Sequence, residues 1–160
     1  MKYLGLLRHA KSDWNDSSMR DFDRGLNERG RAGARLIGRY IRSQDQKWDC
    51  LLASPAIRVR HTLDEAALGI EPTFDPRLYL AGPETHFDVI RDQAGDADAV
   101  LIAASLRRRV GRAATPEVRR VVHLRGVWPG GRACEVREPA PPRCFPRRPP
   151  RRAATRTIAQ

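Results

Sequence analysis

The chain has 160 residues, of which 30 are Lys or Arg and 19 are Asp or Glu, giving a formal net charge of +11. The charge is uneven: residues 1–104 carry 15 basic and 16 acidic side chains, whereas residues 105–160 carry 15 basic and 3 acidic ones. This distribution excludes a uniformly basic domain, and the length suits one domain with a sizeable core. No apolar run approaches the roughly 20 residues that cross a bilayer, so we expect no membrane partner.

The first predicted elements are a strand, a polar loop and a helix. The apolar run 2–7 predicts a buried strand, and residues 11–26 form a loop rich in Asp, Ser and Asn. Asn27 is typical of the N-cap of a helix, which the spacing extends to about Ser43. The expected apolar face of this helix comprises Gly33, Leu36, Ile37, Tyr40 and Ile41.

A second strand and helix follow. Residues 50–53 predict a buried strand. Ser54 is then expected to cap a helix with Pro55 in its first turn, and Gly69 to end it. The predicted apolar stripe of this helix comprises Ala56, Val59, Leu63 and Ala66.

The last recognisable pair is a helix and a strand. The helix is predicted to begin at Pro83 and to bury Phe87 and Ile90, and residues 99–103 predict a strand without polar alternation. Strands alternating with helices favour an α/β fold, with a mainly parallel sheet covered by helices. The pattern holds through residues 1–104, which we assign to one α/β domain.

Residues 105–160 differ sharply from this domain. They contain 15 Arg, 8 Pro, 7 Ala and 4 Gly, and no Lys. Such a composition predicts either a disordered Arg/Pro-rich tail or codons read in a shifted frame of GC-rich DNA. Moving the frame by one base, with free third bases chosen to suit, lets residues 105–130 read as a helix-like and then a strand-like sequence. Both interpretations predict that the domain 1–104 is truncated.

Candidate catalytic residues follow the first two strands. Arg8 and His9 come where the first strand ends, and ligands of parallel sheets gather at the carboxyl ends of strands. A neutral imidazole can attack a phosphoryl group, and neighbouring arginines both favour the neutral form and bind phosphate oxygens. The alternative is a strand-end histidine satisfied by a backbone carbonyl. Arg58, in the first turn of the second helix, is expected to reach the same edge, although a solvated arginine is the common case.

Four motifs in order and spacing resemble the SixA-type phosphohistidine phosphatases of the histidine phosphatase superfamily, which has a phosphoglycerate mutase-like fold. The resemblance implies that His9 is the nucleophile and forms a phosphohistidine intermediate that water hydrolyses. It also implies that Arg8 and Arg58 bind the phosphate, and that neither a metal nor an organic cofactor is needed. The motifs span 7–12, 21–30, 54–58 and 77–80.

The chain also departs from the family pattern. Gly25 stands where the family usually has Pro, and His61 where it often has Gln. After the strand ending near Ala103, the family places Gly-His-Asn-Pro-Gly, whose histidine binds phosphate; this chain continues Ala104-Ser105. Loss of one transition-state donor predicts impaired activity. The proton donor for the leaving group is open among three loop acids, although such acids are more often turn formers: Asp13, Asp16 and Asp23.

The sequence therefore predicts a hydrolase that acts on phosphohistidine or a small phosphomonoester. The expected partner is a phosphorylated protein or metabolite. The alternatives are a catalytically dead phosphate-binding module and a nucleic-acid-binding tail. Nucleic acid is disfavoured because the tail lacks Lys and offers only Trp128 and Phe145 for stacking.

Cysteine usage and the amino-terminal residues bear on the compartment. The three cysteines are scattered, with neither a disulfide framework nor zinc-ligand spacing. Arg8 follows the first apolar residues too early for a secretory signal. We expect a reducing, cytoplasmic setting and no structural metal.

Overall fold

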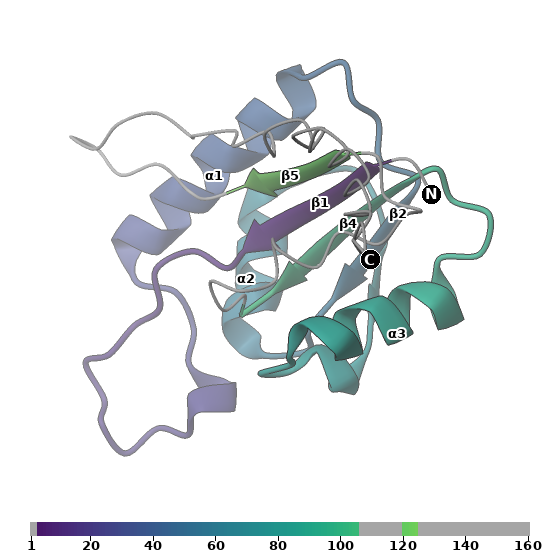
Figure 1. The fold of residues 1–160 in the computed structure, drawn as a ribbon. Coiled ribbons are helices and arrows are strands. Elements are labelled where there is room, and N and C mark those ends of the chain that lie inside the picture. The colour runs from purple at the N-terminus through teal and green to yellow at the C-terminus, as the bar shows by residue number, and fades with distance from the viewer. Residues whose placement is uncertain (1–2, 106–119, 125–160) are drawn as a thin grey trace, which may run out of the picture.

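The computed structural model describes residues 3–105 and 120–124, which contain a five-stranded parallel sheet (Figure 1). The spatial order of the strands is β3-β2-β4-β1-β5, so β1 and β4 are neighbours at the centre although 90 residues of chain separate them. The strands are β1 (Tyr3–Arg8), β2 (Cys50–Ala53), β3 (Pro72–Phe74), β4 (Ala99–Ala104) and β5 (Arg120–Leu124).

Helices cover both faces of the sheet. Helices α1 and α2 lie behind the sheet in Figure 1, and α3 lies in front of it. The predicted α/β class with a parallel, helix-covered sheet is therefore confirmed. No helix in the part of the chain that the structure describes is long and apolar enough to cross a membrane. The helices are α1 (Glu28–Ser43), α2 (Ile57–Ala66) and α3 (Pro83–Gln93), with short 3-10 helices η1 (Asp21–Asp23) and η2 (Pro76–Leu78).

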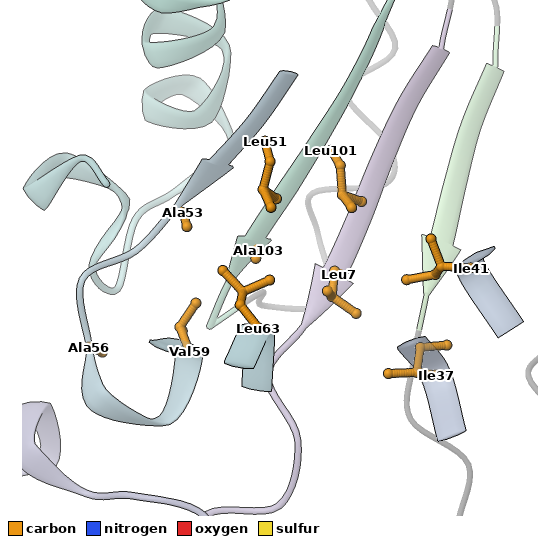
Figure 2. Close-up of a cluster of buried hydrophobic side chains, with 10 residues drawn as sticks. All are labelled: Leu7, Ile37, Ile41, Leu51, Ala53, Ala56, Val59, Leu63, Leu101 and Ala103. Atoms are coloured by element: carbon orange, nitrogen blue, oxygen red, sulfur yellow. The ribbon is translucent and has the colours of Figure 1, made fainter. Parts of the chain in front are cut away.

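Alternating residues of the central strands build two separate apolar layers. Leu4 and Leu6 of β1 pack in the layer of α3, whereas Leu7 packs in the layer of α1 and α2. Figure 2 shows this second layer, with Leu51 and Leu101 on adjacent strands facing the helices. Both layers are nearly closed to solvent, which explains why the strands read as continuous apolar runs rather than as alternating ones.

Helices α1 and α2 approach each other so closely that small residues are required between them. A Cβ atom on Gly38 would lie 2.0 Å from the backbone oxygen of Ala66. Arg42 reaches across from α1 and donates to the backbone oxygens of Ala66 and Ala67, which cap α2. Because Gly and Ala fill this interface, Leu36 falls outside it and is 37 % exposed, so its predicted place on the apolar face was wrong.

The ends of α2 also differ from the prediction. Ser54 does not cap the helix: its backbone N–H donates to Ala103, which keeps the chain extended until Ala56, the observed N-cap. The helix ends at Ala66, followed by Ala67 in the left-handed region with φ 46°. Gly69, the predicted end, lies beyond that turn.

Strand β5 lies beyond residue 104, where the sequence placed the end of the domain. It pairs in parallel with β1, with Tyr3 opposite Arg120 and Leu7 opposite Leu124. The sheet therefore gains one strand from the stretch 105–160, through a β-branched run that sequence patterning overlooked. Apart from Ser105, the rest of that stretch lies outside the described residues, so a disordered tail and a shifted frame both stay predictions.

Candidate active site

The carboxyl ends of β1 and β4 bring His9 and Ser105 side by side. Arg8 pairs with Ala104 in the register of the two strands, so the next residue of each strand leaves the sheet at the same level. The backbone N–H of His9 donates to the oxygen of Ala104 at 3.3 Å. His9 therefore lies at the strand edge where parallel sheets bind ligands.

The ring of His9 is held in one tautomer. Its Nδ1 lies 2.8 Å from the backbone oxygen of Ala10, and because a carbonyl oxygen only accepts, Nδ1 carries the hydrogen. Burial, together with the charges of Arg58 and Arg8, lowers the pKa of His9 to about 4, against the opposing effects of the Ala10 hydrogen bond and the Asp21 charge. At neutral pH the ring is uncharged, with its lone pair on Nε2.

Thr62 of α2 fixes the backbone directly after the histidine. The N–H of Ala10 donates to Thr62 Oγ1 at 3.0 Å, and the Thr62 hydroxyl donates to the backbone oxygen of Arg58 at 2.6 Å. The Thr62 side chain is buried. One hydroxyl thus links the acceptor of the His9 ring to the first turn of α2.

Arg58 is the second residue of α2, and its guanidinium lies buried over the strand ends. Nε and Nη2 donate to Ser105 Oγ at 3.2 and 2.9 Å. Nη2 also donates to Asp21 Oδ2 at 2.9 Å, and Nη1 donates to the Asp21 backbone oxygen. A buried positive charge therefore lies at the edge that the sequence indicated, and its charge reaches His9.

Asp21 and Tyr79 close the outer side of this group. The Tyr79 hydroxyl donates to Asp21 Oδ2 at 2.9 Å, and the Tyr79 ring meets the Phe22 ring edge-to-face at 5.1 Å. Partial burial alone would raise the pKa of Asp21, but the hydrogen bond from Tyr79 and the Arg58 charge outweigh it and hold that pKa below its usual value. Burial, followed by the Asp21 contact, raises the pKa of Tyr79.

Arg8 ends β1 and is exposed at the same rim. No described residue accepts a hydrogen bond from its guanidinium, yet its charge is among those that lower the pKa of His9. An exposed cation beside a neutral imidazole and a buried arginine suits the binding of a phosphoryl group.

Residues 4–110 match the family model of the histidine phosphatase superfamily, branch 1. The chain belongs to this superfamily. Its curated relatives include an uncharacterized chloroplastic protein of Arabidopsis thaliana, 43% identical over 77 residues, or 48% of this chain and 35% of that protein. An uncharacterized protein of Mycobacterium tuberculosis is 35% identical over 96 residues, or 60% of each chain. The chain thus spans only 35% and 60% of the lengths of these relatives.

Solved structures give the same superfamily fold. A structure from Agrobacterium tumefaciens that carries the name phosphohistidine phosphatase SixA is 33% identical, with a TM-score of 0.58. The match covers 66% of this chain and 68% of that one. The phosphoglycerate mutase-like architecture predicted from the four motifs is therefore confirmed.

The two unusual superfamily positions prove to be neighbours. A Cβ atom on Gly25 would lie 3.1 Å from Nδ1 and 3.2 Å from Cε1 of His61. A residue larger than Gly at position 25 would therefore crowd the imidazole of His61. Nδ1 of His61 is buried and has no hydrogen-bond partner within the described residues.

The loop after His9 is closed at its base. Ser12 forms an antiparallel bridge with Leu26, and Asp13 N–H donates to the Gly25 backbone oxygen at 3.0 Å. A Cβ atom on Gly30 would lie 2.1 Å from the backbone oxygen of Lys11, so the first turn of α1 packs directly on this base. The loop projects from the base at the strand-end edge of the sheet.

The three loop acids expected as proton donors accept hydrogen bonds within their own loop. Asp13 accepts from the Asn15 backbone, Asp16 from Ser18, and Asp23 from Arg20. Such contacts are typical of turn formers. The acid that reaches the buried arginine is instead Asp21.

Sequence reasoning missed Asp21, Thr62, Tyr79 and Ser105 as parts of this group. Asp21 and Tyr79 do lie inside the motifs of the superfamily resemblance, which is the signal that could have indicated them. Ser105 had a positional signal, since it directly follows β4. Among residues 3–105 and 120–124, no three His, Cys, Asp or Glu side chains form a group that could hold a metal ion.

Proposed function

We propose that this chain is a phosphatase that hydrolyses phosphohistidine or a small phosphomonoester through a phosphorylated His9. The observation that carries the proposal is the state of the His9 ring. Its Nδ1 donates to Ala10, its Nε2 keeps the lone pair, and its pKa of about 4 leaves it uncharged at neutral pH beside Arg8 and Arg58. Membership of the histidine phosphatase superfamily supports the same proposal.

In the first step the two arginines bind the phosphoryl oxygens. Arg58 donates from a buried position and Arg8 from the rim, which holds phosphorus in front of His9 Nε2. The lone pair of Nε2 forms a bond to phosphorus while the bond to the leaving group breaks. Nδ1 keeps its hydrogen and goes on donating it to the backbone oxygen of Ala10, which stabilises the positive charge that develops on the ring.

The second step returns the enzyme to its resting state. Water attacks phosphorus, the bond between Nε2 and phosphorus breaks, and inorganic phosphate leaves. The low pKa of His9 makes its ring a good leaving group in this step. A phosphohistidine substrate needs less protonation of its leaving group than an alkyl ester does, so the proposed step on that substrate does not depend on Asp13, Asp16 or Asp23, which accept hydrogen bonds within their own loop.

The proposed substrate is carried by a phosphorylated protein or a small metabolite, and the proposed compartment is the cytoplasm. The absent second histidine of the family pattern predicts modest turnover. Removing one transition-state donor typically costs about 100- to 1,000-fold in rate.

The test is hydrolysis of p-nitrophenyl phosphate and of a phosphohistidine peptide by the full 160-residue chain. We expect His9→Ala to abolish turnover and the phosphoryl adduct, which is trapped in alkali because phosphohistidine is stable there. His86→Phe is the matched control, since it removes a buried histidine of α3. Full activity of His9→Ala contradicts the proposal. Phosphate binding without any turnover identifies a binding module instead.

A further inference from the structure

We infer that Ser105 is a phosphate-binding residue, whose hydroxyl donates a hydrogen bond to the phosphoryl group in front of His9. The inference rests on the proposed function and names a third donor for the same group. It starts from the position of Ser105. The register of β1 and β4 places Ser105 directly beside His9 at the strand ends.

The hydrogen bonds of the Ser105 hydroxyl fix where its own hydrogen can go. A serine hydroxyl has two acceptor lone pairs and one hydrogen. Two N–H groups of Arg58 donate to Ser105 Oγ, from Nε at 3.2 Å and Nη2 at 2.9 Å. Both acceptor positions are therefore in use, and the hydroxyl hydrogen points away from the guanidinium.

No group in the described part of the chain accepts that hydrogen. A phosphoryl oxygen bound between Arg58 and His9 would supply the missing acceptor. The two charged donors also polarise the hydroxyl, because hydrogen bonds in a chain strengthen one another. The Ser105 hydroxyl can thus donate a hydrogen bond to an anion, whereas both of its acceptor positions are already used by Arg58.

A purely positioning role for Ser105 makes a different prediction. Asp21 holds the same guanidinium through its carboxylate and through its backbone oxygen. Arg58 therefore keeps two anchors when the Ser105 hydroxyl is removed. A loss of anion binding in such a variant reports the missing donor rather than a displaced arginine.

The experiment compares Ser105→Ala with Ser105→Thr, which keeps a hydroxyl. We expect Ser105→Ala to lower kcat/KM for p-nitrophenyl phosphate about 100-fold, as for other transition-state donors. Tungstate serves as the probe because it is a tetrahedral oxyanion like phosphate. We expect Ser105→Ala to weaken tungstate binding by about 10-fold or more in calorimetry, because hydrogen bonds to charged groups are strong. Ser105→Thr should retain most of both properties. Ser43→Ala, which removes an exposed hydroxyl at the end of α1, is the control and should change neither.

A double-mutant cycle on tungstate affinity separates direct from indirect action. In an Arg58→Lys background, Ser105→Ala should weaken binding further if the hydroxyl touches the anion. The inference is overturned if Ser105→Ala causes no further change in the Arg58→Lys background. It is also overturned if the single variant keeps the kcat/KM and the tungstate affinity of the wild type. In both cases, turnover by the wild type leaves the proposed function standing. Tungstate binding that Ser105→Ala weakens, without turnover by the wild type, supports the donor and contradicts hydrolysis. A wild-type chain that neither binds tungstate nor turns over substrate contradicts both.

Discussion

Two Arg–Asp pairs of this protein have opposite exposures. At the strand ends, the side chain of Arg58 is 4% exposed and that of its partner Asp21 is 45% exposed. Beside α3, the side chain of Asp75 is 5% exposed and that of Arg77 is 45% exposed. The buried member decides what each pair does: a buried arginine offers positive charge to an anion, whereas the buried Asp75 carboxylate holds the backbone of η2.

The same two regions each contain a histidine, half-buried in the case of His9 and fully buried in the case of His86. His9 and His86 both donate from Nδ1 to a backbone oxygen, His86 to that of Gly82 at 2.6 Å. Burial is the main cause that lowers the pKa of each. His86 is 1% exposed, and its Nε2 has no partner among the described residues. Only the histidine at the strand ends therefore has an environment suited to reaction with a ligand.

The largest difference in activity should appear between two single variants, Arg58→Ala and Arg77→Ala. Arg58→Ala removes the buried cation, and we expect kcat/KM for p-nitrophenyl phosphate to fall about 1,000-fold, as for loss of a charged transition-state donor. Arg77→Ala removes only the exposed member of the other pair, so kcat/KM should stay unchanged. Steady-state kinetics on both variants, with melting temperatures, measure the contrast. Equal losses of activity would show that the two pairs do not differ in function.

A smaller effect concerns the pH dependence of stability. Because burial lowers the pKa of His86 in the folded chain, the unfolded chain binds a proton more readily below about pH 6.5. Stability from this group is complete above that pH and is lost as the pH falls. His86→Phe should therefore lose less free energy of unfolding between pH 7.5 and 5.5 than the wild type, measured by urea titration. His9 contributes with the same sign to both proteins, and identical losses would exclude a role for His86.

The smallest expected effect is a shift of the acid limb of activity. The charge of Asp21 raises the pKa of His9, so Asp21→Asn should lower it. The acid limb of kcat/KM, which we expect near pH 4 in the wild type, should then move to lower pH. The KM for an anionic substrate should fall as well, because a competing carboxylate is removed from Arg58. Asp75→Asn is the matched control, and a limb that moves equally in both variants would contradict the assignment.

Local patterns predicted most of the fold. The strand 99–103, the helix capped by Asn27 and the helix start at Pro83 were all correct, because each depends on a continuous apolar run or a cap within its own segment. Strand β3 was missed, because it has three residues and forms through pairing with β2. Ser54 was assigned to the wrong element, since a contact with β4 decides its backbone conformation.

The site was predictable only where its residues follow strands in the chain. His9 and Arg58 were predicted as site residues in this way. Asp21 and Ser105 were not, since their roles depend on contacts with Arg58 across 37 and 47 residues. Their residue types are common in loops, so only the three-dimensional structure distinguishes them from ordinary turn residues.

The closed base of the loop after His9 fixes the two ends of this loop independently of the residues between them. The bridge between Ser12 and Leu26 holds both ends of the loop, and α1 packs on that base through Gly30. Insertions or exchanges between residues 14 and 20 would therefore leave His9 in place, as for other loops whose ends are fixed. The segment that would contact the leaving group in the proposed reaction can therefore change without moving His9.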